Sequence, residues 1–221
     1  MCILVIKQKG VKFPTMEQVQ ACCDNNPDGF ALSYSHKGKI TTYKTMSKKE
    51  FLDYYKKVMN LPYEEVSMIL HARIKTHGSI GLKNCHCWES DGMSFAHNGI
   101  LSIKNRGDLT DSETFFRDIF LPIWRKGKSW KQAEGAINAI IGSSKFGFLE
   151  KNGEIHHYGV FQKENDILFS NTSYMTRTYV APTYPSGVSG YGKYGSLAAG
   201  RSYYNAMPKV YDQWEDWDDL M

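Results

Sequence analysis

Apolar residues along the first part of the chain follow strand-like spacing and then helix-like spacing. An apolar, β-branched run at residues 2–7 predicts a buried strand. Thr15 predicts the N-cap of a helix that continues to about Cys23, with Glu17 in its first turn. The sequence Asn-Asn-Pro-Asp-Gly at residues 25–29 predicts a turn after this helix.

A hairpin and a second helix are predicted next. Residues 30–35 and 39–43 have the composition of two strands, joined across the turn at residues 36–38. Ser47 predicts the N-cap of the second helix, and Glu50, three residues later, completes a capping box. The apolar face of this helix is predicted to contain Phe51, Tyr54, Tyr55 and Val58.

The remaining strands and helices occur in groups. One strand is predicted at 65–73, and another at 93–97 with a continuation past Gly99 to residue 103. Two helices are predicted next, from Asp111 to Phe120 and from Ser129 to about Ile141. Three strands then follow, at residues 146–150, 154–159 and 167–170. Grouped elements predict an α+β layered architecture with mainly antiparallel sheets.

The composition changes near residue 180, which predicts two regions. We expect one domain over residues 2–180, followed by a flexible segment rich in Gly, Ser and Tyr and then by an acidic, aromatic tail, together covering 181–221. With 221 residues, 42% of them hydrophobic, the chain is long enough to bury a sizeable core.

Charge and cysteine usage narrow the class of protein. The net charge of +4 is small and the lysines are scattered, which argues against a nucleic-acid-binding surface. No run approaches the roughly 20 apolar residues of a membrane span, and the start lacks the features of a signal peptide. Five cysteines, partly adjacent, form no disulfide framework, so we expect a reducing, cytoplasmic location.

Cys2 is the first candidate for chemistry. Methionine aminopeptidases remove Met1 when the next side chain is small, and this would leave Cys2 with both a thiol and a free α-amine. An α-amine titrates near pH ~8, so it can accept the proton of the thiol at neutral pH. A thiol that carries its own base is an activated nucleophile. The alternative is that a lone cysteine at position 2 has no function.

Other polar clusters follow strands, and each has a simpler explanation. Arg73 could form a surface ion pair, Asn98-Gly99 could be a hairpin turn, and Thr110 with Asp111 could cap a helix. The segment Cys85-His86-Cys87, together with Cys22 and Cys23, could bind zinc. The spacing argues against this, because zinc-binding cysteines are usually separated by two residues and Cys85 and Cys87 by one.

Taken together, the clusters resemble the class II glutamine amidotransferase domain, an N-terminal-nucleophile hydrolase. The matching elements run from Cys2 to about Ser173. They are Cys2, Asn26-Pro27-Asp28-Gly29, Arg73-Ile74-Lys75-Thr76-His77-Gly78, Asn84-Cys85-His86, His97-Asn98-Gly99 and Asp111-Ser112-Glu113. The chain departs from the family pattern at three places: Ile74 replaces a usual Trp, Cys87 replaces Pro, and Arg is missing before the Pro-Asp-Gly turn.

The resemblance implies a fold and roles for eight residues. The fold is a four-layer α-β-β-α sandwich. Cys2 would be the nucleophile, Asn98 and Gly99 would stabilise the oxyanion, Arg73 would bind the carboxylate of glutamine, and Asp111 its ammonium. Thr76, His77 and Gly78 would shape the pocket. The resemblance implies no metal or other cofactor, and we expect His71, His86 and His97 to serve structure rather than catalysis.

The resemblance also implies an activity, glutamine hydrolysis that releases ammonia. No synthase motif follows Ser173, so a separate synthetase or another protein, bound through residues 181–221, would accept the nitrogen. Two alternatives remain: cleavage of another γ-glutamyl or protein amide, and non-catalytic binding of glutamine. The presence of a nucleophile together with oxyanion donors argues against the last.

Overall fold

Two antiparallel sheets form the centre of the protein, in a computed structural model that describes residues 2–75, 79–107, 109–127 and 129–176. The first sheet has the strand order β3-β2-β4-β1-β10-β9, and the second β5-β6-β7-β8. The strands are β1 (Ile3–Lys7), β2 (Phe30–His36), β3 (Lys39–Thr45), β4 (Ser67–Ala72), β5 (Trp88–Ser90), β6 (Met93–Asn98), β7 (Lys145–Glu150), β8 (Ile155–Tyr158), β9 (Gln162–Glu164) and β10 (Ile167–Phe169).

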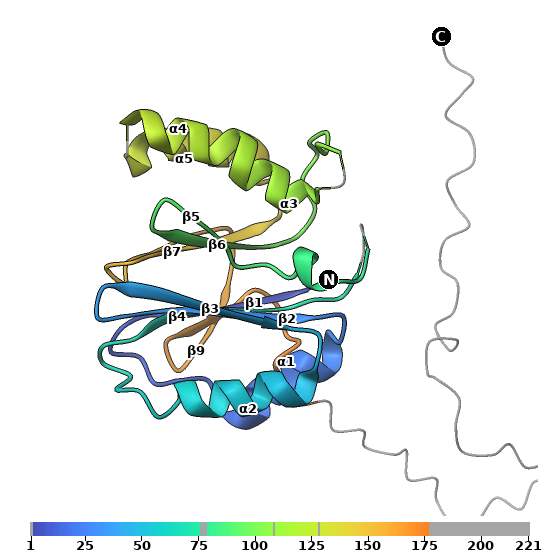
Figure 1. The fold of residues 1–221 in the computed structure, drawn as a ribbon, viewed down its shortest axis with the longest axis vertical. Coiled ribbons are helices and arrows are strands. Elements are labelled where there is room, and N and C mark those ends of the chain that lie inside the picture. Colours follow the sequence, from blue (N-terminus) through green and yellow to red (C-terminus); the bar gives the residue numbers. More distant parts are fainter. Residues whose placement is uncertain (1, 76–78, 108, 128, 177–221) are drawn as a thin grey trace, which may run out of the picture. The chain divides into compact units, whose positions relative to one another are not determined.

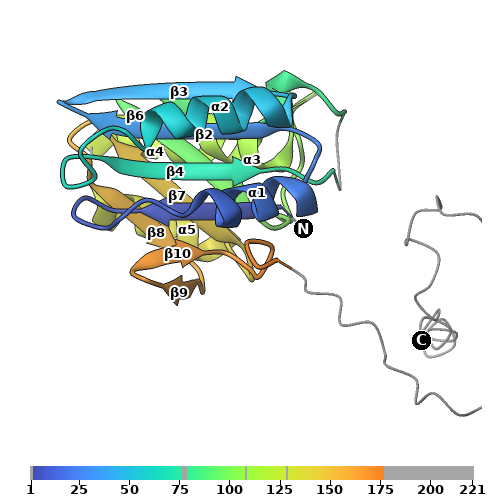
Figure 2. The same ribbon diagram turned by 90° about the horizontal axis from the view of Figure 1, so that it is seen from below.

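Helices cover the outer face of each sheet, which makes four layers (Figure 1). Helices α1 (Met16–Asn25) and α2 (Lys48–Val58) pack on the first sheet, as the view in Figure 2 also shows. The second sheet is covered by α3 (Asp111–Thr114), η2 (Phe115–Phe120), α4 (Leu121–Gly127) and α5 (Trp130–Ile140). A short 3₁₀ helix, η1, spans Leu82–Asn84. The predicted α+β class and the four-layer α-β-β-α sandwich are therefore confirmed.

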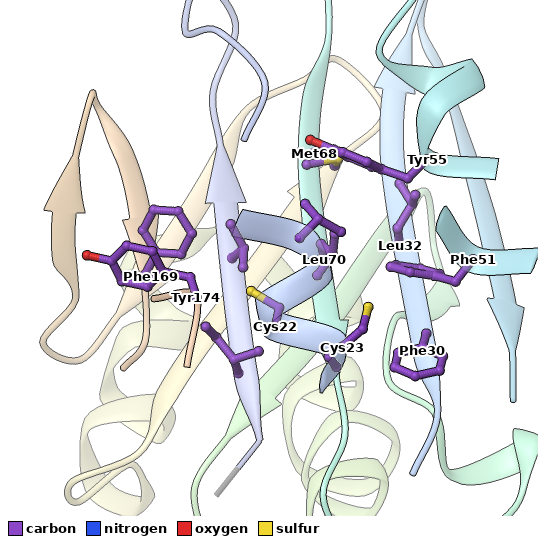
Figure 3. Packing of buried hydrophobic residues seen from close by; sticks show 14 of the residues in the cluster. Cys22, Cys23, Phe30, Leu32, Phe51, Tyr55, Met68, Leu70, Phe169 and Tyr174 are labelled. Atoms are coloured by element: carbon purple, nitrogen blue, oxygen red, sulfur yellow. The ribbon is translucent and has the colours of Figure 1, made fainter. Parts of the chain in front are cut away.

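Alternation along the strands divides the apolar side chains among three core regions. In β1, Ile3 and Val5 pack toward α1 and α2, whereas Leu4 and Ile6 face the second sheet. Figure 3 shows part of the first region, where strand residues meet those of the two helices. Ten of its members are Cys22, Cys23, Phe30, Leu32, Phe51, Tyr55, Met68, Leu70, Phe169 and Tyr174.

The space between the sheets contains aliphatic side chains such as Leu4, Ile6 and Ile69 together with smaller ones. Ala31 and Ala96 lie there, and a side chain added at Gly147 would place its Cβ 3.2 Å from Ile6 Cδ1. In contrast, the region between the second sheet and its helices is aromatic, with the Phe95 ring between 4.7 and 5.7 Å from the ring centres of its four phenylalanine neighbours. Aromatic side chains therefore fill the space between the second sheet and its helices, whereas aliphatic and small ones fill the space between the sheets.

Both predicted N-caps are present, and the capping box forms at Thr15 instead of at Ser47. The hydroxyl of Thr15 accepts from Gln18 N, and the Gln18 side chain returns a bond to Thr15 N, which completes a capping box. Ser47 accepts from Glu50 N, but the Glu50 carboxylate accepts from the Thr45 hydroxyl instead of from Ser47 N. The box predicted at Ser47 is therefore half formed, because Thr45 is the closer donor.

Two predicted segments differ from the structure. The strand ending at Asn98 does not continue to residue 103, because Gly99 has φ +144° and the chain leaves the sheet there. The helix that begins at Asp111 does not end at Phe120, but continues through a π-helical turn to Gly127. This turn precedes Pro122, which has no N–H to donate, so the wider turn accommodates a residue that an α-helix interior excludes.

The strands β5 and β9 were not predicted, because each has three residues and only a weak apolar pattern. All five cysteines are free thiols. Among the residues described, no helix has the length and apolar character needed to cross a membrane.

Lys7 is a fully buried lysine at the far end of β1 from Cys2. Its ammonium donates to the carbonyls of Tyr63 and Val66 and lies 4.5 Å from the centre of the Phe13 ring. Burial lowers the pKa of Lys7 from 10.5 to about 8, against the opposing charge of Glu64. The folded chain therefore releases this proton at a lower pH than the unfolded chain.

We expect Lys7 to favour the folded state increasingly as the pH rises through mild alkali. Between its two pKa values the unfolded chain binds more protons at Lys7, so this residue should raise the free energy of unfolding by roughly 1–3 kcal/mol. The buried thiols act in the opposite direction, because burial raises the pKa of Cys23 and Cys87 to about 12. The Lys7 effect is therefore the change, between about pH 7.5 and about pH 10, in the difference between wild type and Lys7→Met, measured by denaturant unfolding. An unchanged difference at the two pH values would contradict the prediction.

Candidate active site

Cys2 points into the space between the two sheets. Its neighbour Ile3 packs toward the outer helices, so alternation turns Cys2 to the same side as Leu4, which faces the second sheet. The thiol donates to the carbonyl of Ile74 over 3.4 Å, and the carbonyl of Cys2 accepts from Asn171 Nδ2 over 2.6 Å. Both ends of this residue are therefore held in place.

Arg73 points into the same space from the neighbouring strand. Ala72 packs on the outer side of β4, so the next residue faces inward, as His71 does. Strands β1 and β4 are antiparallel, with Ile3 opposite Ala72, and this register brings Arg73 next to Cys2. Burial raises the pKa of the Cys2 thiol, and the positive charge of Arg73 acts in the opposite direction.

The predicted turn at residues 26–29 holds the backbone of Arg73. Arg73 N donates to Gly29 O over 2.9 Å, and Asp28 N donates to Arg73 O over 2.8 Å. The Asp28 carboxylate also accepts from Lys75 N. Gly29 is needed here, because at φ +130° an added Cβ would lie 2.6 Å from Cys85 Sγ.

The side chain of Arg73 is also held. Its Nη1 donates to Ser79 O over 2.9 Å, and Asn84 Nδ2 donates to the same carbonyl over 2.8 Å. Arg73 is only 4% exposed, so this bond fixes the guanidinium under the loop that contains Ser79. The predicted pocket residues Thr76, His77 and Gly78 precede Ser79 in the sequence and lie outside the described residues.

Asn98 faces Cys2 and Arg73 from the second sheet. In β6, Phe95 packs toward the helices and Ala96 toward the first sheet, so Asn98 also faces the first sheet. Its Nδ2 donates to Ser170 Oγ over 2.8 Å, whereas its Oδ1 is buried without a partner among the described residues. The described residues therefore bind one polar end of this amide and leave the other without a hydrogen bond.

Gly99 turns the chain out of β6 in a conformation that favours glycine. At φ +144°, an added Cβ would lie 2.2 Å from Ser144 Oγ and 2.9 Å from Ser144 Cα. The Ser144 hydroxyl donates to Ile100 O over 3.2 Å, which holds the backbone after the turn. β6 pairs with β5 and β7, so the alternative of a hairpin turn at Asn98-Gly99 is wrong.

Asp111 is tied to the loop that follows Gly99. One carboxylate oxygen accepts from Leu101 N over 2.8 Å, and the other accepts from Ser112 N over 2.8 Å. Thr110 caps the helix through a bond from Glu113 N, so the capping function considered for this segment is present. Binding of a substrate ammonium by Asp111 stays a prediction.

Three buried histidines lie near the candidate site. The side chain of His71 faces the inter-sheet space and stacks on His86, whereas that of His97 lies on the helix side of β6, next to Ser112 of α3. The rings of His71 and His86 stack with centres 3.8 Å apart, and His97 lies 6.2 Å beyond His86. His86 Nδ1 accepts from His97 N, and His97 Nδ1 is 2.7 Å from Ser112 Oγ. Burial lowers the pKa of His71 and His86 well below the usual range, and that of His97 to about 4. The three imidazole rings are therefore uncharged and only weakly basic at neutral pH.

The cysteines considered as zinc ligands lie in different layers. Cys22 and Cys23 are on α1, on the outer side of the first sheet, whereas Cys85 and Cys87 lie between the sheets. The group of possible metal ligands found in the described part of the chain is elsewhere, and consists of Glu150, Glu154 and His156. Glu150 already accepts a hydrogen bond from Trp130 Nε1, so we do not assign a metal site to these three residues.

Sequence reasoning missed Ser170 and Asn171, which follow β10. Asn171 holds the carbonyl of Cys2, and Ser170 binds Asn98. The sequence could have indicated Ser170, because alternate residues of a strand face the same side and Leu168 faces the second sheet. Ser170 is therefore a polar residue at an inward position. The sequence pattern does not indicate which inward polar group it meets.

No family model and no curated protein sequence matches this chain. Solved structures overlap it in part. One is the glutamine phosphoribosylpyrophosphate amidotransferase of B. subtilis, at 16% identity and TM-score 0.44, over 68% of this chain and 35% of that one. Another is a glutamine aminotransferase class-II domain protein of Silicibacter pomeroyi, at 14% identity and TM-score 0.37, over 68% and 73%. A third is an allosteric regulatory enzyme of purine biosynthesis, at 16% identity and TM-score 0.45, over 68% and 36%.

Gly99 offers a test of the geometry of this site. Gly99→Ala should destabilise the protein by about 2–4 kcal/mol, because the new methyl group meets Ser144 and the backbone is strained. Thermal or denaturant unfolding measures the change. Gly135→Ala is the matched control: it lies within α5 with open space around it, and should be neutral or stabilising by up to ~1 kcal/mol. Unchanged stability of Gly99→Ala would contradict this description.

Proposed function

We propose that this chain is a class II glutamine amidotransferase domain that hydrolyses the side-chain amide of glutamine, with Cys2 as the nucleophile. The observation that carries the proposal is the convergence of Cys2 and Arg73 from one sheet with Asn98 from the other. A thiol, a guanidinium and an amide next to a glycine turn are the groups that amide hydrolysis of an amino acid requires.

In the first step the thiolate of Cys2 attacks the carboxamide carbon of glutamine. A C–S bond forms, and the π electrons of the carbonyl move to its oxygen, which becomes negatively charged. The side-chain amide of Asn98 and the N–H of Gly99 would donate to this oxyanion. Loss of one such donor typically lowers the rate by ~10²–10³-fold.

Collapse of this intermediate releases ammonia. The oxyanion re-forms the carbonyl, the C–N bond breaks, and the leaving nitrogen takes the proton that the α-amine of Cys2 received from the thiol. The γ-glutamyl thioester that remains is attacked by water, which gives its proton to the same amine. The C–S bond then breaks, which yields glutamate and returns the thiol.

An α-amine suits the role of base better than the nearby histidines. Burial raises the pKa of the Cys2 thiol, so the thiol needs a base to become a thiolate. His71, His86 and His97 are weak bases, because burial lowers the pKa of each. The mechanism therefore requires removal of Met1, which frees the amine of Cys2.

Arg73 would bind the α-carboxylate of glutamine, and Asp111 its ammonium. A planar guanidinium can bind a carboxylate through two parallel hydrogen bonds, which a lysine cannot do. Thr76, His77 and Gly78 would complete the pocket. The ammonia acceptor would be a separate protein that binds through residues 181–221, which lie outside the described part of the chain.

Cys2 gives the direct test of the mechanism. Mass spectrometry of the purified protein should show a chain without Met1, and Cys2→Ala should abolish glutamate release from glutamine. Cys22→Ala is the control, because this thiol lies in the outer core, and it should retain the activity. An intact Met1 in an active enzyme, or normal turnover of Cys2→Ala, would contradict the mechanism. Cys2-dependent cleavage of another amide, without glutamate release, would instead favour the alternative substrates.

Arg73→Lys tests binding of the carboxylate. The glutamine KM should rise about 10–100-fold with a smaller change in kcat, because a charge-assisted hydrogen bond worth ~1.5–3 kcal/mol is lost. Steady-state kinetics measure both constants. Arg125→Lys is the control, since this exposed arginine of α4 pairs with Asp91 away from the site. A fall in kcat at unchanged KM would count against a substrate-binding function of Arg73.

A further inference from the structure

Ser170 joins three parts of the candidate site, and the proposed function gives it no task. It follows β10 and is 6% exposed. Its hydroxyl oxygen accepts from Leu4 N over 2.8 Å and from Asn98 Nδ2 over 2.8 Å, and its own N–H donates to Leu4 O over 2.9 Å. One residue therefore connects the strand of the nucleophile with the proposed oxyanion donor on the other sheet.

The side chain of Asn98 needs such a contact to have a defined orientation. Rotation of a terminal amide about χ2 is a soft, roughly two-fold torsion, so the backbone of β6 alone does not fix the plane of the amide. Within the described residues, Ser170 supplies the hydrogen bond of this side chain.

We propose that Ser170 is a positioning residue that holds the Asn98 amide in the orientation required by the oxyanion. One hydrogen of Nδ2 is bound by Ser170, which leaves the second for the substrate. The inference rests on the proposed function, since it assigns a task to Ser170 through Asn98. Oxyanion donors act by being fixed before the reaction, so an amide free to rotate would lose part of its effect.

The position of Ser170 relative to Cys2 is fixed as well. Two bonds to Leu4 continue the pairing of β10 with β1, and the next residue, Asn171, binds the carbonyl of Cys2. The loop after β10 therefore holds both the nucleophile and the donor. A movement of this loop would change the distance between the two, and not only the orientation of one.

A double-mutant cycle tests the proposal. Ser170→Ala should lower kcat by about 10–100-fold, less than loss of the donor itself, with glutamine KM changed less than about two-fold. In the Asn98→Ala background, the same change should have little further effect, because Ser170 then has no donor to position. Equal effects in both backgrounds would overturn the proposal.

Two controls separate positioning from general damage to the fold. Alkylation of Cys2 by iodoacetamide forms no oxyanion, so its rate should be the same in Ser170→Ala and wild type. Ser35 is a matched serine: it is 1% exposed and joins the sheets elsewhere, through a 2.7 Å bond to Lys151 O. Ser35→Ala should leave kcat unchanged. A parallel loss of alkylation and kcat in Ser170→Ala would overturn the proposal.

A spectroscopic measurement decides the proposal even if glutamine is not the substrate. The side-chain amide resonances of Asn98, assigned by their absence in Asn98→Ala, should shift and exchange faster with solvent in Ser170→Ala. Unchanged resonances would overturn the positioning function of Ser170. Changed resonances in a wild-type protein that releases no glutamate would support the positioning while the proposed function fails.

Discussion

The register of β1 between β4 and β10 controls where Cys2 points. Side chains alternate along a strand, so a shift by one residue would turn Cys2 to the outer helices and bring Ile3 into the inter-sheet space. The register is fixed on both sides, by five pairs with β4 and by bonds from Ser170 to Leu4. The buried side chains of Ile3 and Leu4, on opposite faces, penalise any slip.

The inter-sheet space combines close packing with buried polar groups. Ala31, Ala96 and Gly147 are small residues in this space, and His71 and His86 stack there without carrying charge. Stacked neutral rings cost less to bury than ions, because a charged imidazole would lose its hydration there. Neutral rings can therefore lie next to the polar residues of the candidate site without adding a buried charge.

Much of the architecture follows from local patterns, whereas the contacts of the site do not. Strand periodicity and the cap at Thr15 were sufficient for β1, α1 and the first hairpin. The continuation past Gly99 was wrong, because Ile100 and Leu101 look like strand residues while the close contact with Ser144 is visible only in three dimensions. The order of the motifs indicated Cys2, Arg73 and Asn98. Ser170 belongs to no motif, and its hydrogen bond with Asn98 joins residues that are 72 positions apart in the sequence.

Leu4 and Ser170 are separated by 166 residues, and the pairing of their strands has a consequence for folding. During synthesis β1 can pair with β4 early, but its other edge stays open until β10 has left the ribosome. Contacts of such long sequence separation form late, since the loop entropy must be overcome first. Cys2 is made early and the residues after β10 that hold it are made late, so an incomplete chain would lack these contacts of the candidate site.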